Sequence, residues 1–380
     1  MPGPLTGVKV VEMAGLGPAP FCGMVLADLG AEVVRVERTG AVTGEHSSAT
    51  RHDLHNRGKR SIGVDLKSAG GVEVVMRLAG GADILFEGFR PGVMERLGVG
   101  PAQCLAANPR LVYGRVTGFG RDGPYAAMAG HDIDYIALSG ALHAVGPEEE
   151  PAPPLNLVGD FGGGGMLAAV GVLAAMVSAR VSGQGQVVDA AMVDGSALLT
   201  TSHHGHLAEG WWQDRRRSNL LDGAAPFYSV YHTADGGHVA VGALEPQFFV
   251  ALLTGLHLDP EDVPAQSDRS GWEEMRRVFS ERFASETRDH WAEIFEGTDA
   301  CVAPVLSFTE SPLHPQNQAR EVFIVVDGVT QPAPAPRFSE TPASIRCGPV
   351  APGADTDAVL AALGYTKDRI GKLRQEGAVA

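Results

Sequence analysis

Strands alternate with helices along the first 120 residues, and this alternation constrains the fold more than any other feature of the sequence. Residues 8–13 have the composition of a strand, a Gly-Leu-Gly turn follows at 15–17, and a helix is predicted at 20–29. Residues 31–38 alternate like a second strand, which completes a βαβ unit with parallel strands. Further strands are predicted at 62–66, at 82–87 and, after a turn, within 108–116. The sequence therefore predicts an α/β fold with a mostly parallel sheet.

The glycine turn at 15–17 lies at the carboxyl end of its strand, where doubly wound folds bind ligands. Glu37 falls about where the ribose-binding acid of a dinucleotide site is expected, so NAD(P) binding is an alternative to consider. The glycine motif is incomplete, because Pro20 stands where a third glycine or alanine is expected. The following Arg38 suits a phosphate better than a bare ribose hydroxyl. The pattern disfavours a dinucleotide site without excluding one.

The formal net charge of −15 argues against nucleic acid as the main ligand, so any polyanionic ligand must meet a locally basic site. The four cysteines are scattered without a Cys-x-x-Cys pair, which predicts a reducing compartment and no metal site. The N-terminal residues lack the features of a signal peptide, and the longest apolar run, 166–177, is too short to span a bilayer. These features predict a cytoplasmic protein without a membrane span.

The second half of the chain has a different composition from the first. Residues 201–225 contain clustered histidines, tryptophans and arginines, and we predict a linker there because the histidines lack a metal-binding spacing. A β-hairpin is predicted within 226–242, and helices are predicted at 272–284 and 287–295. We therefore expect a first domain from residues 1–200 and a small α+β domain from residues 226–325. Residues 326–380 end in a predicted pair of helices.

Two segments combine reactive side chains with glycines that let a ligand approach the backbone. His131 follows a glycine, and Asp160 precedes a run of four glycines at the start of a predicted helix. An acid and an imidazole brought together there can exchange protons with a carbon acid and stabilise an enolate oxygen. The structural alternative is that Asp160 caps the helix and His131 lies in a polar loop. The pattern alone leaves both interpretations open.

A basic segment precedes the predicted strand at 62–66. Arg57, Lys59 and Arg60 follow Asn56, a composition that fits the phosphates and the adenine edge of a nucleotide. A solvated basic loop fits the same spacing equally well. The residues before this segment, 39–52, are predicted to form an irregular surface loop. In the second half, Glu245 precedes a proline and is predicted to complement a helix dipole.

The chain carries short motifs in one order at residues 5–12 (LTGVKVVE), 27–37 (ADLGAEVVRVE), 56–60 (NRGKR), 90–92 (RPG), 130–135 (GHDIDY), 154–157 (PLNL), 159–164 (GDFGGG), 185–189 (GQVVD), 222–226 (DGAAP), 242–248 (GALEPQF) and 298–302 (TDACV). Together they resemble the class III CoA-transferase family and, within it, the α-methylacyl-CoA racemases. Transferases of this family usually have tyrosine at the position of His131. The racemases have histidine there, pair it with the aspartate at Asp160, and keep a glutamate at Glu245.

This resemblance implies a racemase that deprotonates a 2-methylacyl-CoA at Cα through His131 or Asp160, depending on the enantiomer. The other residue then protonates the opposite face of the planar enolate, while Glu245 orients His131 and supports its imidazolium. A helix start near Asp160 is expected to supply donors for the enolate oxygen. No metal or redox cofactor is required, because CoA is part of the thioester substrate. The alternative is a CoA-transferase that moves CoA between carboxylic acids through an acyl-Asp160 anhydride.

The same resemblance implies the domain arrangement and the assembly. The family fold is a Rossmann-like large domain made from both chain ends plus a small domain, which assigns residues 326–380 to the domain begun by 1–200. Two chains interlock like rings, so a homodimer is expected. The implied CoA contacts are Arg38, Leu54, His55, Asn56, Arg57, Gly88, Phe89, Arg90, Arg96, Gly130, Asp132, Ile133, Asp134 and Tyr135.

Overall fold

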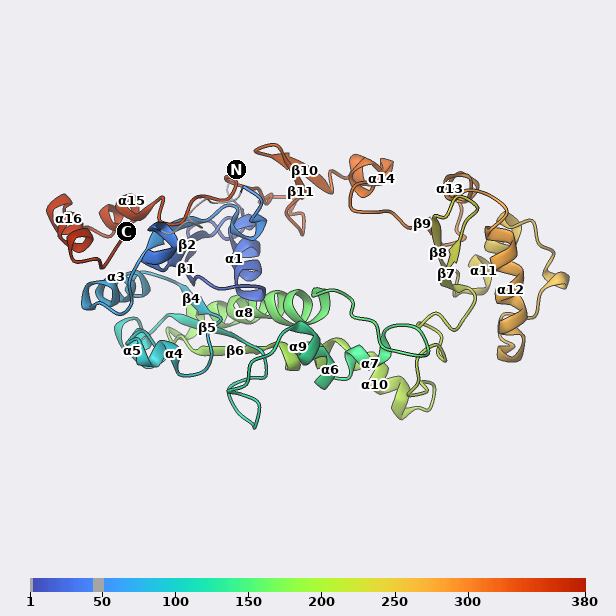
Figure 1. Cartoon of the computed structure of the whole chain (residues 1–380), viewed down its shortest axis with the longest axis horizontal. Coiled ribbons are helices and arrows are strands. Elements are labelled where there is room, and N and C mark those ends of the chain that lie inside the picture. The colour runs from blue at the N-terminus through green and yellow to red at the C-terminus, as the bar shows by residue number, and fades with distance from the viewer. Residues whose placement is uncertain (1–2, 44–50) are drawn as a thin grey trace. The chain divides into compact units, whose positions relative to one another are not determined.

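The computed structural model describes residues 3–43 and 51–380, which fold into two compact units (Figure 1). The first unit comprises the chain up to Ser139, Leu155–Leu199 and Gln316–Ala380, so both chain ends contribute to it. The second unit comprises Gly140–Pro154 and Thr200–Pro315. These boundaries differ from the predicted ranges, because residues 140–154 group with the second unit and residues 316–325 group with the first.

Six parallel strands form the sheet of the first unit in the order β3-β2-β1-β4-β5-β6. The central strand β1 pairs with β2 on one side, Val10 opposite Val33, and with β4 on the other, Val10 opposite Ile84. Strands β2 and β3 extend the sheet on one side of β1, whereas β4, β5 and β6 extend it on the other side, so the strand order reverses between β1 and β4. Doubly wound sheets bind ligands at such a point, beyond the carboxyl ends of the strands. The predicted α/β fold with a parallel sheet is confirmed. The strands are β1 (Lys9–Met13), β2 (Glu32–Glu37), β3 (Arg60–Gly63), β4 (Ile84–Glu87), β5 (Val112–Thr117) and β6 (Val187–Ala191).

Helices cover both faces of this sheet, because successive residues of a buried strand point to opposite faces and both faces are apolar. On β1, Val10 packs in the core formed with α1 and α8, whereas Val11 packs in the core on the other face. That second core includes Leu360 and Leu373 from the C-terminal helices, so the end of the chain covers a sheet formed by its beginning. The covering helices are α1 (Pro18–Asp28), α3 (Ala69–Gly80), α5 (Pro101–Ala107), α8 (Leu167–Ser182), α15 (Thr356–Ala362) and α16 (Lys367–Gln375).

A single long helix carries Asp160. Residues Leu157–Met166 form a π-helix that continues directly into α8, and the apolar run predicted at 166–177 is therefore part of a longer helix. By length and composition alone, this helix of 26 residues (Leu157–Ser182) passes the test for a membrane span, and 44% of its most apolar window is buried inside the protein. Its inner face packs on the sheet through Ala168, Val172 and Ala175.

Part of the loop predicted at 39–52 is helical, which corrects the prediction for that part. Residues Thr39–Thr43 form helix α2, one residue after the end of β2. Residues 44–50 lie outside the described residues. The other short elements of the first unit are η1 (Leu54–Asn56), α4 (Val93–Arg96), α6 (Asp132–Leu138), α9 (Met192–Leu199), β10 (Phe323–Val326) and β11 (Val329–Pro332).

The second unit is built on a three-stranded antiparallel sheet. Helices pack on one face of this sheet, where Phe279, Phe283 and Trp291 are buried in the core. The hairpin predicted within 226–242 is confirmed by the antiparallel pairing of β7 with β8. The elements are α7 (Ala141–Ala144), α10 (Thr201–Ala208), β7 (Tyr228–His232), β8 (His238–Gly242), α11 (Pro246–Gly255), α12 (Trp272–Phe283), α13 (Arg288–Phe295) and β9 (Val302–Pro304).

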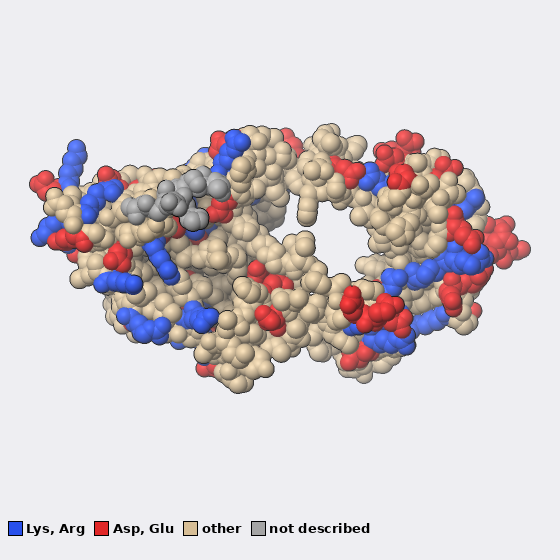
Figure 2. All heavy atoms as spheres, viewed as in Figure 1, with Lys and Arg blue, Asp and Glu red and all other residues tan. Residues whose placement is uncertain are grey.

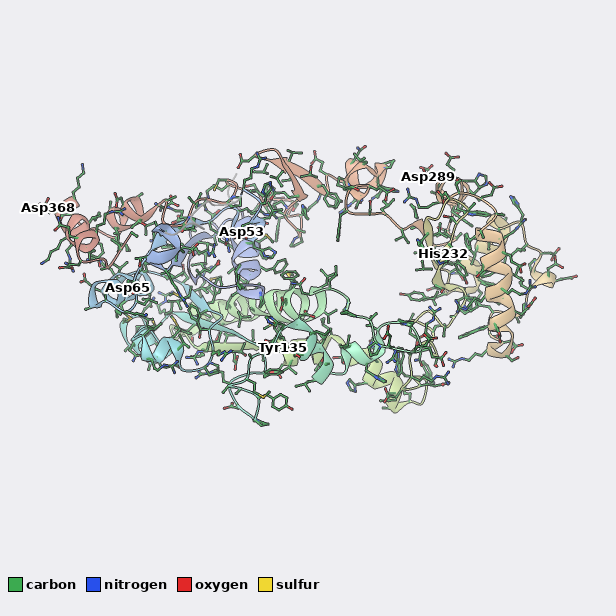
Figure 3. All side chains as sticks on the ribbon, in the orientation of Figure 1. Asp53, Asp65, Tyr135, His232, Asp289 and Asp368 are labelled. Atoms are coloured by element: carbon green, nitrogen blue, oxygen red, sulfur yellow. The ribbon has the colours of Figure 1, made fainter. Side chains whose placement is uncertain are left out.

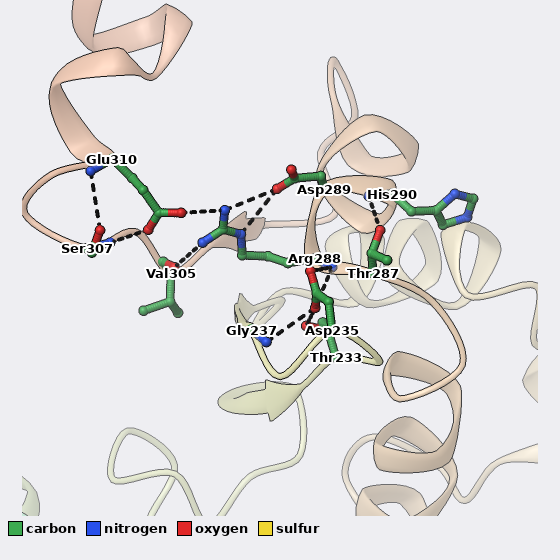
Figure 4. Close-up of polar contacts among 10 residues, drawn as sticks. All are labelled: Thr233, Asp235, Gly237, Thr287, Arg288, Asp289, His290, Val305, Ser307 and Glu310. Atoms are coloured by element: carbon green, nitrogen blue, oxygen red, sulfur yellow. Dashed lines mark hydrogen bonds and ion pairs between the residues drawn. The ribbon is translucent and has the colours of Figure 1, made fainter.

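Polar contacts fix the connections of the second unit. At the hairpin turn, the Asp235 carboxylate accepts hydrogen bonds from the main-chain N–H groups of Gly237 and Arg288, and the Arg288 guanidinium pairs with Glu310 at 2.8 Å (Figure 4). Acidic and basic side chains lie intermixed on the surface of this unit (Figure 2). The segment predicted as a linker, 201–225, begins with helix α10.

Candidate active site

A cavity of about 500 Å³ opens at the carboxyl ends of β1, β4 and β5, within the first unit. Its wall includes the glycine turn after β1, the segment Gly88–Pro91 after β4 and the residues 116–120 at the end of β5. Both His131 and Asp160 line it, although one precedes α6 and the other lies in the π-helix. The fold therefore brings the two predicted bases to one cavity at the ligand-binding edge of the sheet.

His131 occupies the position directly before helix α6, and its side chain is exposed. Its main-chain N–H donates to the carboxylate of Asp134, with 2.9 Å between the nitrogen and Oδ2. The hydroxyl of Tyr135 (Figure 3) donates to the carbonyl of Gly130, which fixes the residue before the histidine as well. Glycine is required at 130, because a Cβ there would come within 3 Å of the Tyr135 and Phe119 rings. The imidazole thus extends from an anchored backbone.

Asp160 lies in the first turn of the π-helix, a rare conformation that is frequent at functional sites. One oxygen of its carboxylate, Oδ2, accepts a hydrogen bond from the Asn156 side chain at 3.0 Å. Its main-chain N–H donates to the carboxylate of Asp132 at 2.6 Å. The glycine turn approaches closely, because a Cβ on Gly17 would lie 3.3 Å from Asp160 Oδ2, and Gly17 adopts a positive φ of 67°. The turn therefore both shapes the cavity and limits the motion of the carboxylate.

The expectation that the helix start near Asp160 supplies donors for an enolate oxygen is not met by its nearest amides. The N–H groups of Gly159 and Asp160 both donate to the Asp132 carboxylate. Donors that are already satisfied do not stabilise a developing charge on a second oxygen. Donors for an enolate must therefore come from another part of the cavity wall.

The structure corrects the predicted CoA contact of Arg57. Its guanidinium is buried, pairs with Asp28 at 2.6 Å, and donates to the side chain of Gln331 and to the carbonyl of Pro332. These bonds join helix α1 to strand β11, which is a structural role. Lys59 of the same basic segment is likewise buried and pairs with Glu12 at 2.6 Å. Loop composition could not reveal this, because the partners lie far away in the sequence.

Residues 54–56, directly before Arg57, are partly or fully buried. Asn56 is buried and donates to Asp53. The His55 ring contacts those of Phe21 and Phe161, with centroids 5.8 and 5.2 Å away, and burial lowers the pKa of His55. Phe161 follows Asp160 in the chain, so this aromatic cluster packs the segment that carries Asp160. Leu54 does not line the cavity that His131 and Asp160 share.

A second cavity of about 600 Å³ lies beside the first. Arg38 and Arg96, predicted to contact CoA, both line it. Phe89 lines both cavities, whereas Gly88, Arg90, Gly130 and Tyr135 line the first. Two arginines and an aromatic ring at adjoining cavities suit a ligand that carries phosphates at one end. Ile133 and Asp134 lie on α6 next to the first cavity, and Glu245 lies in the second unit directly before α11.

A buried charge network that the sequence did not reveal supports the wall between the two cavities. The Glu87 carboxylate accepts a hydrogen bond from the main-chain N–H of Phe89 at 2.6 Å and lies 3.7 Å from the Arg115 guanidinium. Arg115 also pairs with Glu95 at 2.6 Å. Burial raises the pKa of Glu87 from 4.5 to about 7, although the bond from Phe89 and the charge of Arg115 oppose the rise.

The raised pKa of Glu87 predicts a pH dependence of stability. Between about pH 4.5 and 7 the folded chain holds a proton on Glu87 that the unfolded chain has released, so the free energy of unfolding falls as the pH rises. The loss approaches at most about 3 kcal/mol above pH 7. Glu87→Gln keeps an acceptor for Phe89 but cannot ionise, so we expect this part of the slope to disappear. Urea unfolding of both proteins at pH 5 and 8 measures it, and parallel pH profiles would contradict the assignment.

Comparison with known proteins places this site in a family. The model of CoA-transferase family III matches residues 5–357. Alpha-methylacyl-CoA racemases from Mus musculus and Homo sapiens are 48% and 44% identical over 377 and 378 residues, each covering 98% of this chain and 96% of the relative. The crystal structure of a CAIB/BAIF family protein from Brucella suis matches with a TM-score of 0.81 at 27% identity, covering 96% of this chain and 100% of that chain. The chain therefore belongs to CoA-transferase family III.

Proposed function

We propose that this protein is a racemase that interconverts the (2R) and (2S) forms of 2-methylacyl-CoA thioesters. The observation that carries the proposal is that an imidazole and a carboxylate, His131 and Asp160, line one cavity at the carboxyl edge of the sheet. The two racemases that are 48% and 44% identical over nearly the whole chain support the same activity. Histidine at position 131, where the transferases usually carry tyrosine, favours two-base chemistry.

The proposed reaction moves one proton off Cα and another onto its opposite face. One base breaks the Cα–H bond, and the electron pair moves to the thioester carbonyl to give a planar enolate. The other base, which enters the step protonated, then forms the new C–H bond as the carbonyl is restored. The two bases therefore share one proton before the reaction and exchange protonation states during it. Glu245 is proposed to orient His131.

The acyl-CoA is proposed to occupy both cavities, with its thioester in the first and its phosphates near Arg38 and Arg96 in the second. Phe89 borders both spaces, so the chain between thioester and nucleotide passes this ring. Arg90, which lines the first cavity, is a further cation on that path. The Arg57 side chain takes no part in this arrangement. No metal or redox cofactor enters the proposed reaction.

We also propose a cytoplasmic homodimer. One face of α8 leaves Val170, Val177 and Val181 exposed to 59%, 61% and 88%, and these residues share one stripe of the helix. A contiguous apolar surface of this kind is typical of a protein interface, and a second copy of the chain is the proposed occupant. Sedimentation equilibrium is expected to give twice the chain mass of 39.7 kDa. A species with the mass of one chain at micromolar concentration would contradict the dimer.

A CoA-transferase is the second candidate, because Asp160 faces the cavity and can also act as a nucleophile. In that reaction the carboxylate attacks the thioester carbonyl, CoA leaves as a thiolate, and an acyl-Asp160 anhydride remains. The thiolate then attacks the Asp160 carbonyl of the anhydride, which releases the donor carboxylate and leaves an aspartyl-CoA thioester. An added carboxylate displaces CoA from this thioester to form a second anhydride, and CoA attacks the carbonyl of the added acid, which releases its CoA thioester and frees Asp160. The two functions therefore differ in whether a covalent acyl-enzyme forms.

The test is incubation with one enantiomer of a 2-methylacyl-CoA in D2O. We expect deuterium at Cα, measured by mass spectrometry, together with formation of the other enantiomer, measured by chiral analysis. The same samples are tested for an increase in protein mass on addition of hydroxylamine, which traps an anhydride as a hydroxamate at the aspartate. Transfer of CoA to an added carboxylic acid without deuterium uptake would replace the racemase proposal with the transferase.

A further inference from the structure

The side chain of Asp132 is directed at the backbone that carries Asp160. Its Oδ2 accepts the main-chain N–H of Asp160 at 2.6 Å, and its carboxylate also accepts the N–H of Gly159. The residue is only 6% exposed. A carboxylate on α6 therefore caps the first turn of a helix that begins 25 residues further along the chain, at Leu157. Such a tertiary cap satisfies N–H groups that lack partners within their own helix.

The approach between the two segments is close and depends on glycine. A Cβ on residue 159 would lie 2.5 Å from Asp132 Oδ2, shorter than any ordinary contact. The other oxygen of the carboxylate, Oδ1, is buried without a hydrogen-bond partner among the described residues. Burial raises the pKa of Asp132, and the two bonds from the main chain oppose the rise. A buried carboxylate that is only half satisfied costs stability, so its presence beside the cavity calls for a functional reason.

We propose that Asp132 is a positioning residue whose carboxylate holds Asp160 at a fixed distance from His131. This inference depends on the proposed two-base racemisation. Asp132 follows His131 directly in the chain, and its carboxylate binds the main-chain N–H of Asp160. The main chain of one base is therefore connected to that of the other through the side chain of Asp132. The bases must face opposite sides of a single carbon atom, and a displacement of about 1 Å can reduce the rate by about 100-fold.

The two acids in the first turn of α6 bind the main chain at different bases. Asp134 binds the main-chain N–H of His131, whereas Asp132 binds that of Asp160. The resemblance to the family implied that Asp132 contacts CoA, and in the structure its carboxylate has a partner inside the protein. The two interpretations predict different kinetics: a CoA contact affects KM, whereas a positioning residue affects the inversion step.

The decisive variant is Asp132→Leu, which keeps the branched shape of the side chain but removes the oxygen that accepts the main-chain N–H of Asp160. We expect kcat for inversion to fall by about 10- to 100-fold with KM for the acyl-CoA changed less than about threefold. In D2O, the enantiomer that His131 deprotonates still gains deuterium with retention of configuration, because His131 and its proton exchange remain intact. The ratio of exchange with retention to inversion is therefore expected to rise for that enantiomer.

A second variant reaches the same contact from the other side. Gly159→Ala places a Cβ against Asp132 Oδ2, and we expect the same rise in that ratio, so the inference stays testable if one variant does not fold. Asp368→Asn, on the exposed first turn of α16, is the matched control and should retain wild-type rates. An equal loss of exchange and inversion, or a loss confined to KM, overturns the positioning role. A wild-type protein that exchanges no deuterium overturns the racemase and this inference together.

Discussion

Asp160→Asn is expected to lower kcat for inversion of a 2-methylacyl-CoA by about 1,000-fold, because a positioned acid–base group typically contributes 100- to 10,000-fold. The amide cannot remove or deliver the proton at Cα on its side of the substrate. The structure predicts that folding survives the change, since the amide oxygen can still accept the hydrogen bond from Asn156 and the main-chain N–H still donates to Asp132. Thermal unfolding should therefore stay near that of the wild type.

The loss should also depend on the enantiomer. With Asp160→Asn in D2O, the enantiomer that His131 deprotonates is expected to exchange its α-hydrogen with retention, whereas the other enantiomer should show neither exchange nor inversion. Asp289→Asn, exposed on the first turn of α13 in the second unit (Figure 3), serves as the control. Inversion at the wild-type rate in Asp160→Asn would exclude this carboxylate as a base.

The sheet could be predicted from the sequence because its signals are local. Residues 8–13 and 31–38 show apolar strand patterns separated by a glycine turn and a helix, and parallel pairing of β1 with β2 follows from the handedness of such units. The same rule places the ends of β1, β4 and β5 at one edge, where the cavity lies. The meeting of His131 with Asp160 was a resemblance-based expectation, and the two residues do line that cavity.

The misplaced residues are those whose partners are distant in the sequence. Arg57 looked like a phosphate ligand because nothing in the basic segment indicates that Asp28 and Gln331 would bury it. The direction of the Asp132 side chain was equally hidden, because it depends on the glycine at 159 and on the π-helical turn that presents the N–H of Asp160. A glycine run that normally predicts a loop is helical here, since its glycines pack closely on neighbouring elements; a Cβ on Gly163, for example, would lie 2.6 Å from the main chain of Ser196.

His131→Asn is expected to lower kcat for inversion by a similar factor, about 1,000-fold, while leaving the fold intact. Position 131 directly precedes α6, and asparagine is among the residues most favoured at such a position, so the helix should begin as before. The main-chain N–H still donates to Asp134. In D2O, exchange with retention should now persist only for the enantiomer that Asp160 deprotonates, which is the opposite pattern to that of Asp160→Asn.

The pair of variants also separates the two candidate functions, because only one of them needs His131 as a base. A racemase loses inversion in both variants and shows exchange for opposite enantiomers, which assigns each base to one face of the substrate. A transferase that uses Asp160 as nucleophile loses activity in Asp160→Asn but retains transfer of CoA to an added carboxylic acid, and the hydroxylamine-trapped adduct, in His131→Asn. If both variants instead keep exchange for the same enantiomer, a third group must remove that proton, and a two-base mechanism through His131 and Asp160 is wrong.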